Sequence, residues 1–282
     1  MRLTILGSGG CMAIPKPLCG CRVCREARVK GVPYSRGGPS AFLHDVNLLI
    51  DTPAEIGEQL NRERVRRLEY LMLTHLDPDH VEGLRIAEQI TLDFRTWRAC
   101  PGKAITLLVP EALVEPLGRL STQYGPAIGH YVRSGFLKIE TFRETARAGD
   151  VAITAVPVPQ DAQTAFIYVY EKDGKKLVYA ACDIKPFPEE RAEVRGADVL
   201  VIQPGIFETG LRHRFCYPPD HVSRTSLYTF AKTLELARRI GARRTVFTHL
   251  EEYWHRGYDD YRRLEKEIPD VRFAWDGMTL RA

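Results

Sequence analysis

The stretch Leu71-Met-Leu-Thr-His75-Leu-Asp77-Pro-Asp79-His80 decides the fold of this chain. Its apolar beginning, from Tyr70 to Leu73, is typical of a buried strand that is about to end. Two histidines and two aspartates follow within six residues, and Pro78 prevents the strand from continuing. Imidazole and carboxylate groups held in one tight turn are suitable ligands for Zn, Mn or Fe. The alternative interpretation is a polar turn in which Asp79 caps a helix, although caps seldom bring two histidines with them.

The composition is that of an ordinary globular protein. Of the 282 residues, 44% are hydrophobic and 27% are charged, so the chain can bury a sizeable core. The net charge of +4 comes from Lys and Arg spread along the chain, so nucleic acid is not an expected partner. No stretch approaches the ~18–20 apolar residues of a membrane span, and we expect no signal peptide. Seven cysteines, three of them bunched, favour metal binding in a reducing, cytoplasmic compartment over disulfides.

A second group of candidate ligands lies in Pro17-Leu-Cys19-Gly-Cys21-Arg-Val-Cys24. Three thiolates at the spacing Cys-x-Cys-x2-Cys can occupy three corners of a tetrahedral structural zinc site. We expect the fourth ligand to be His255, which follows the C-terminal Thr-His249 element by a few residues. Three other residues stay open as the fourth ligand: Cys11, Glu252 and Cys216. Such a site would attach the loop at about 11–30 to the far end of the chain.

The motif HLDPDH resembles the HxHxDH signature of the metallo-β-lactamase superfamily, with Asp77 in place of the second histidine. The resemblance implies an α+β fold, the four-layer αββα sandwich, formed by residues 1–282 as one domain. Within the superfamily the chain is most similar to the phosphodiesterase branch of the phosphonate-breakdown (carbon–phosphorus lyase) accessory proteins. That branch has a similar Cys-rich loop and a similar Asp-Gly-Met hairpin at its end. A cofactor-biosynthesis protein for pyrroloquinoline quinone is the next most similar.

The resemblance also implies two divalent metal ions in the active site. The implied ligands are His75, Asp77 and Asp161 for one ion, Asp79, His80 and His249 for the other, and Asp183 as the bridge. Asp161 is chosen because Val156-Pro-Val-Pro-Gln160-Asp161 has no histidine where the superfamily usually has its third. Asp51 ends a predicted strand and is expected to hydrogen-bond the ligating histidines from outside. Two imidazoles replaced by carboxylates should favour Mn, Fe or Mg over Zn at the first site.

Two further assignments follow from the resemblance. His221 precedes a predicted helix and is implied to assist the departing phosphate oxygen, so that Asp79 and His221 are the catalytic residues. Gly7-Ser-Gly-Gly10 is implied to border the active site. Cys182, which precedes Asp183 at the end of an apolar strand, is interpreted as a small buried hydrophobe.

The leading hypothesis is a metal-dependent hydrolase that cleaves a small cyclic phosphate or nucleotide-like diester. Its expected partner is a small molecule with a phosphate ester, without membrane contact, and a homodimer is compatible with the sequence. A lactone or thioester hydrolase is the first alternative, because the same architecture serves those reactions. A non-catalytic metal-binding accessory protein of a cofactor pathway is the second, because Asp77 and Asp161 alter one metal site.

Hydrophobic patterning predicts the secondary structure around these residues. A hairpin is expected from the strands 40–44 and 47–51. The region 123–130 is predicted to be a loop, and 222–240 a long amphipathic helix. The strand-rich end of the chain, 271–280, is predicted to be a terminal hairpin.

Overall fold

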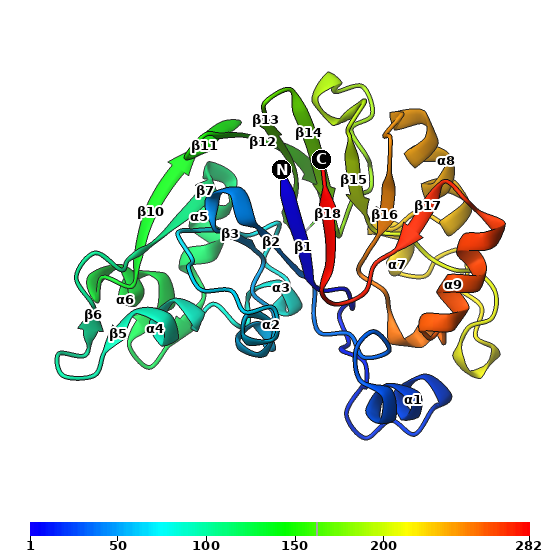
Figure 1. Cartoon of the computed structure of the whole chain (residues 1–282), viewed down its shortest axis with the longest axis horizontal. Coiled ribbons are helices and arrows are strands. Elements are labelled where there is room, and N and C mark those ends of the chain that lie inside the picture. Colours follow the sequence, from blue (N-terminus) through cyan, green and yellow to red (C-terminus); the bar gives the residue numbers. More distant parts are fainter. Residues whose placement is uncertain (162) are drawn as a thin grey trace.

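Two seven-stranded β-sheets form the centre of the computed structural model, which describes residues 1–161 and 163–282 (Figure 1). The first sheet has the order β10-β7-β4-β3-β2-β1-β18. Its strands are β1 (Arg2–Gly7), β2 (Ser40–Leu43), β3 (Leu48–Ile50), β4 (Tyr70–Met72), β7 (Ile105–Pro110), β10 (Leu137–Phe142) and β18 (Met278–Arg281). The strands β1 and β18 are antiparallel neighbours, so the two ends of the chain lie side by side.

The second sheet has the order β11-β12-β13-β14-β15-β16-β17. Its strands are β11 (Thr145–Ala148), β12 (Val151–Pro159), β13 (Thr164–Lys172), β14 (Lys175–Ala180), β15 (Val199–Ile202), β16 (Thr245–Phe247) and β17 (Val271–Phe273). From β14 to β17 the neighbours are parallel, so the carboxyl ends of these strands meet at one edge. Two small hairpins are separate from both sheets: β5 (Leu92–Asp93) with β6 (Arg98–Ala99), and β8 (Ser121–Thr122) with β9 (Gly125–Pro126).

Helices cover the outer faces of the sheets. They are α1 (Arg22–Lys30), α2 (Ile56–Arg62), α3 (Pro78–Val81), α4 (Ile86–Thr91), α5 (Glu111–Gly118), α6 (Ala127–Arg133), α7 (Ser223–Ser226), α8 (Phe230–Ile240) and α9 (Tyr258–Glu267). Figure 1 shows α4 to α6 on the side of the first sheet, α8 and α9 on the side of the second, and α1 projecting at one end. Single turns of 3₁₀-helix occur at His44–Val46, Ala192–Val194, Arg212–Arg214 and Glu252–Trp254. This arrangement confirms the predicted αββα sandwich.

Strand β13 shows how the sequence builds the layers. Tyr168 and Tyr170 belong to the core between the sheets, whereas Ile167 and Val169 belong to the core under the outer helices. Successive side chains of a strand point to opposite faces, so a strand buried on both faces needs a nearly continuous apolar run. Among the residues described, every helix is too short or too polar to cross a membrane.

The hairpin over β2 and β3 is confirmed, but three local predictions are wrong. The region 222–240 is divided into α7 and α8 because Leu227 is extended and Thr229 begins a new helix by capping the Lys232 N–H. The predicted loop at 123–130 contains the start of α6. The predicted terminal hairpin does not form, because β17 pairs with β16 in one sheet and β18 pairs with β1 in the other.

Candidate metal centre and active site

The turn after β4 separates its ligand-type side chains by depth. Pro78 stands in the first turn of α3, where its missing N–H leaves no helical hydrogen bond unmade. His75 and His80 are completely buried, and their ring centroids are 4.0 Å apart. The side chain of Asp77 is 48% exposed. The two histidines therefore lie at the buried side of the site, and Asp77 lies at its exposed side.

Asp79, His80 and His249 meet in a group that we call the Asp79 cluster. Asp79 Oδ2 is 3.5 Å from His80 Nε2 and 3.4 Å from His249 Nε2, and the two nitrogens are 3.4 Å apart. Ligands bound ~2.0–2.1 Å from a tetrahedral metal ion are separated by roughly 3.3–3.4 Å, so this spacing fits one ion. The structure thus brings together the three residues assigned to one ion from the sequence.

A buried acceptor orients His80. Its Nδ1 donates to Asp51 Oδ2 at 2.9 Å, which leaves Nε2 for the cluster. Asp51 is fixed in turn by the backbone N–H and the hydroxyl of Thr74, at 2.7 and 2.8 Å. Burial and the neighbouring His75 lower the pKa of His80, but the charge and hydrogen bond of Asp51 outweigh them and raise it. Asp51 lies where a residue that supports a metal ligand is expected.

His249 has a support of its own that the sequence analysis missed. Its Nδ1 lies 3.2 Å from Glu251 Oε1, and Glu251 also accepts from the Cys11 N–H and thiol. A Cβ at Gly10 would lie only 2.1 Å from Glu251 Oε1, so the glycine leaves the space that this carboxylate occupies. An acid two residues after a ligand-type histidine was the available signal, but sequence spacing alone does not show which way it points.

His75, Asp77 and Asp183 form a second group, which we call the Asp77 cluster. His75 Nε2 is 3.5 Å from Asp77 Oδ2, and no described residue gives this buried nitrogen a hydrogen bond. The other oxygen of Asp77 accepts from Gln163 Nε2 at 2.7 Å. Burial and the nearby Cys182 sulfur raise the pKa of Asp183 to about 6. An unpartnered buried imidazole nitrogen beside two carboxyl groups fits a divalent metal ion.

Asp161 does not join His75 and Asp77, as the sequence analysis expected: it is exposed and belongs to neither cluster. Its neighbour Gln160 turns inward instead and donates to the carbonyl oxygens of Asp183 and Lys185, at 3.2 and 2.7 Å. The strand β12 ends at Pro159, and alternation of sides then gives the inward position to Gln160. Cys182 is the residue that the sequence analysis missed here, because its sulfur lies with the ring nitrogens of His75 and His80.

Three residues of the centre have the left-handed backbone conformation, which is rare for side chains other than glycine. The φ angles are 62° at Asp51, 48° at Asp183 and 60° at His249. Each such residue costs on the order of 1–2 kcal/mol, and such residues concentrate at functional sites. All three follow the end of a core strand.

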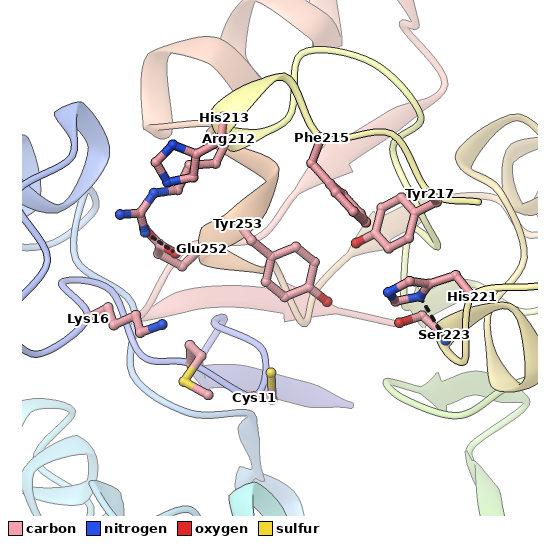
Figure 2. Close-up of a pocket in the computed structure, with 11 residues that line it drawn as sticks. Cys11, Lys16, Arg212, His213, Phe215, Tyr217, His221, Ser223, Glu252 and Tyr253 are labelled. Atoms are coloured by element: carbon pink, nitrogen blue, oxygen red, sulfur yellow. Dashed lines mark hydrogen bonds and ion pairs between the residues drawn. The ribbon is translucent and has the colours of Figure 1, made fainter.

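A cavity of about 640 Å³ lies between the loop of Cys11, the turn of Glu252 and the segment before α7 (Figure 2). One end is basic, and aromatic rings line the rest. The lining residues used below are Cys11, Lys16, Arg212, Phe215, Tyr217, His221 and Tyr253. Cys11 links the cavity to the centre, because its thiol donates to Glu251 Oε2 at 3.3 Å and Glu251 contacts His249.

His221 lies in the cavity wall, just before α7. Its Nδ1 accepts a hydrogen bond from the Ser223 N–H at 3.1 Å, and its ring packs edge-to-face on Tyr217 with centroids 4.9 Å apart. Figure 2 shows the other ring nitrogen directed toward the cavity. α7 also contacts the segment just after Asp183, because Lys185 Nζ donates to the Arg224 carbonyl at 2.5 Å. His221 therefore lies in the cavity wall, in the segment that leads into α7.

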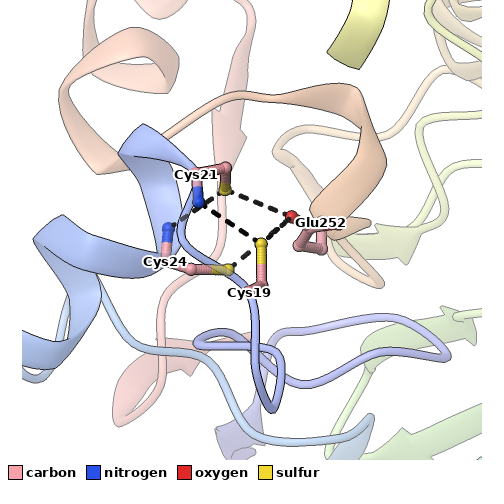
Figure 3. Close-up of side chains that lie close together, drawn as sticks. All are labelled: Cys19, Cys21, Cys24 and Glu252. Carbon is pink, nitrogen blue, oxygen red and sulfur yellow. Dashed lines mark hydrogen bonds between the residues drawn. The ribbon is translucent and has the colours of Figure 1, made fainter.

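The three bunched cysteines converge on Glu252 (Figure 3). Glu252 Oε1 is 3.4 Å from Cys19 Sγ, 3.2 Å from Cys21 Sγ and 3.6 Å from Cys24 Sγ. Burial raises the pKa of the Cys24 thiol to about 12. Three sulfurs and one carboxylate oxygen make the donor set of a tetrahedral metal site. We call these four residues the cysteine cluster.

His255 is not the fourth member of the cysteine cluster, as the sequence analysis expected. Glu252 begins a 3₁₀ turn that ends at Trp254, and His255 follows it in the left-handed conformation with φ of 57°. Its N–H donates to the Glu252 carbonyl, and its Nδ1 is buried without a hydrogen-bond partner among the described residues. The tight turn directs Glu252 toward the sulfurs and His255 away from them.

Comparisons with known proteins agree with this architecture. The sequence profile of the beta-lactamase superfamily domain matches residues 46–250. No significant match was found among curated protein sequences. A diphosphatase described as a new member of the PhnP family has a similar structure, with a TM-score of 0.74 and 22% identity over 100% of this chain and 97% of its own.

Two other solved structures are similar over their full length. Zn(2+)-bound PqqB from Methylobacterium extorquens has a TM-score of 0.69 and 19% identity, covering 100% of both chains. The short form of human tRNase Z has a TM-score of 0.62 and 15% identity, covering 100% of this chain and 99% of its own. At these identities the likeness establishes the fold.

The chain belongs to the metallo-β-lactamase superfamily. Members of this superfamily bind divalent metal ions, and the donor spacing of the Asp79 cluster and the unpartnered nitrogen of His75 fit that chemistry. The residues that would hold the ions are those of the two clusters, at the carboxyl ends of core strands.

Proposed function

We propose that this protein is a metal-dependent phosphodiesterase that hydrolyses a small phosphate diester, such as a cyclic phosphate or a nucleotide-like diester. The observation that carries the proposal is the position of His221 in the wall of a basic and aromatic cavity, which is linked to the metal centre through Cys11 and Glu251. When bound, two divalent ions would neutralise phosphate oxygens and lower the pKa of an attacking water. The remaining roles belong to the chain itself.

His221 is the proton donor for the leaving group. Because the Ser223 N–H donates to Nδ1, that nitrogen carries no proton, and the neutral ring carries its proton on the nitrogen that faces the cavity. A departing alkoxide needs a proton, and general acid catalysis of this kind contributes ~10²–10⁴-fold to the rate. The contact with Tyr217 restricts the tilt of the ring.

The cavity supports a substrate with both charge and a flat organic group. Lys16 and Arg212 provide positive charge at one end, although Arg212 also pairs with Glu252 at 2.9 Å. Phe215, Tyr217 and Tyr253 provide rings on which a base or sugar can pack. Neither a lactone nor a thioester group carries the negative charge that Lys16 and Arg212 would bind, and a thioester departs as a thiolate that needs no general acid, so the diester is preferred.

We propose that Mn, Zn or Fe occupies the centre and that zinc occupies the cysteine cluster. The thiols of Cys19, Cys21 and Cys24 must be reduced to bind a metal, so we also propose a reducing, cytoplasmic location. The proposed partner is a small-molecule phosphate ester.

Metal content and activity together test the proposal. Protein purified without chelator should contain three metal ions per chain, and Cys21→Ser should contain two, with zinc the ion that is lost. Phosphodiester, lactone and thioester substrates should then be assayed with added Mn. We expect phosphodiester turnover that falls ~10²–10⁴-fold in His221→Ala and stays within a few-fold in His213→Ala, the matched control on the same cavity.

Preferential turnover of lactones or thioesters would replace the phosphodiesterase with the first alternative function. A single zinc that is lost in Cys21→Ser, together with no turnover of any substrate, would contradict the hydrolase and favour a non-catalytic metal-binding protein.

A further inference from the structure

Cys182 lies at the junction of the two donor clusters. It follows β14 and precedes Asp183, and its sulfur lies with the ring nitrogens of His75 and His80, all within 4.8 Å of one another. His75 belongs to the Asp77 cluster and His80 to the Asp79 cluster. The sulfur is therefore placed where a ligand of the centre would be.

The Asp77 cluster has three donor residues, and the glutamines and the aspartate on the neighbouring loop do not supply a fourth. His75 Nε2 is buried and has no hydrogen-bond partner among the described residues. The side-chain amide of Gln160 donates hydrogen bonds to two backbone carbonyls, and that of Gln163 donates to Asp77. Asp161 is exposed and belongs to neither cluster.

The surroundings of Cys182 do not suit a small hydrophobe. Its only hydrogen-bond contact among the described residues is a weak one, from the thiol to Asp183 Oδ1 at 3.8 Å. Its other neighbours are imidazole nitrogens, which are themselves metal ligands by type. A thiol in such surroundings has polar neighbours without a good hydrogen bond, and a metal ion shared with His75 would give both groups a partner.

We propose that Cys182 binds metal as a thiolate and completes the Asp77 cluster as a site of His75, Asp77, Cys182 and Asp183. The inference rests on the metal centre of the proposed function and adds a ligand to it. Binding releases the thiol proton to solvent, and no electrons are transferred. A soft thiolate shifts the preference of this site toward Zn, Co or Fe and away from Mn or Mg. For zinc against manganese or magnesium, that preference is opposite to the one expected from its carboxylates alone.

Cobalt(II) provides a direct test. Protein that retains zinc in the cysteine cluster, with its zinc content checked before and after, is supplied with cobalt(II) at the centre. We expect thiolate-to-cobalt charge-transfer absorption in the near ultraviolet, and cobalt-edge X-ray absorption should detect a sulfur scatterer at about 2.3 Å. The X-ray measurement uses the wild-type protein and does not depend on any variant folding.

Two variants identify which cysteine supplies the sulfur ligand. Cys182→Ser should lose the charge-transfer band but keep the weaker metal-centred cobalt bands, whereas Cys11→Ser, which changes the thiol beside Glu251, should keep both. The zinc affinity of the site should fall in Cys182→Ser by more than the ~10–100-fold cost of losing an outer hydrogen bond. The manganese affinity should change less, because manganese prefers oxygen ligands.

A cobalt-loaded wild-type protein that hydrolyses diesters but has no sulfur around cobalt would overturn the role of Cys182 and leave the proposed function intact. A charge-transfer band that persists in Cys182→Ser would do the same. Failure of the wild-type protein to bind any cobalt outside the cysteine cluster would overturn both proposals.

Discussion

The Asp79 and Asp77 clusters touch each other but are built differently. In the Asp79 cluster both histidines are buried and are held from behind, His80 by Asp51 and His249 by Glu251. In the Asp77 cluster only His75 is fully buried, and its Nε2 has no hydrogen-bond partner among the described residues. The first cluster is organised before a metal arrives, whereas the second depends on the metal to bring its donors together.

We expect the two clusters to bind their metal ions with different affinities. Outer hydrogen bonds fix the ring orientation and tautomer of a ligating histidine, so less order is lost on binding. Burial also protects the donors from water, which competes for the ion. We therefore expect a resident ion in the Asp79 cluster and an exchangeable ion in the Asp77 cluster.

The largest expected effect comes from removing a ligand of the Asp79 cluster. His80→Ala should lose that ion, and the rate should fall by about 10³-fold or more because metal charge supplies several kcal/mol to the transition state. Metal content and turnover are the measurements. His130→Ala, a histidine stacked on Tyr124 at a different cavity, is the matched control. Wild-type rates in His80→Ala would exclude the proposed centre.

The next effect concerns the supports of the Asp79 cluster. Asp51→Asn and Glu251→Gln should each weaken metal binding there by ~10–100-fold, because each removes a charged acceptor from a ligating histidine. A chelator competition measures the affinity of each ion separately. Equal losses at both clusters would show that the two are not supported independently.

Acidification should weaken metal binding at the Asp77 cluster through Asp183. Burial raises the pKa of Asp183 to about 6, whereas hydrogen bonding and charge from the nearby histidines outweigh burial and hold the pKa of Asp79 well below its usual range. When protonated, Asp183 stabilises the metal-free folded state. This stabilisation is lost as the pH rises through about 6.

A metal ion requires the ionised carboxylate, so its affinity for the Asp77 cluster should fall about tenfold per pH unit below 6 from this group alone. Chelator competition at pH 5, 6 and 7.5 measures the fall. Asp183→Asn should weaken binding at every pH and remove this step. The same pH dependence of metal affinity in Asp183→Asn as in the wild-type protein would contradict this role of Asp183.

The smallest effect is expected at Gln163. Gln163→Ala removes the 2.7 Å hydrogen bond to Asp77, but that carboxylate is half-exposed and water can replace the amide. The metal affinity of the Asp77 cluster should therefore change by less than about tenfold, as measured by the same competition. A larger loss would show that the Asp77 cluster is as preorganised as its neighbour.

Local sequence was sufficient for the parts of the centre that depend on one strand and one turn. His75, Asp77, Asp79 and His80 follow a buried strand within one short segment, so their grouping needs no knowledge of the rest of the fold. Asp183 and His249 each follow an apolar run, and each lies in one of the two clusters. The superfamily resemblance supplied the pairing of these distant positions.

The wrong assignments share a physical cause. Asp161 and His255 have suitable chemistry, but each lies one to three residues from the side chain that actually points inward, Gln160 or Glu252. A turn reverses the direction of side chains within two residues, and its local backbone angles are not readable from hydrophobic patterning. The positive φ of 57° at His255 is an instance of this.

The sequence by itself determined the alternation of strands and helices, the cysteine loop and the motif at the end of β4, because each depends on residues close together in the chain. Only the tertiary structure decided that Glu252 joins the cysteines, that Glu251 supports His249 and that Cys182 stands between the clusters. The first and third of these contacts join segments far apart in the chain, and the second depends on a left-handed turn. Packing of the two sheets sets all three, and no local pattern encodes them.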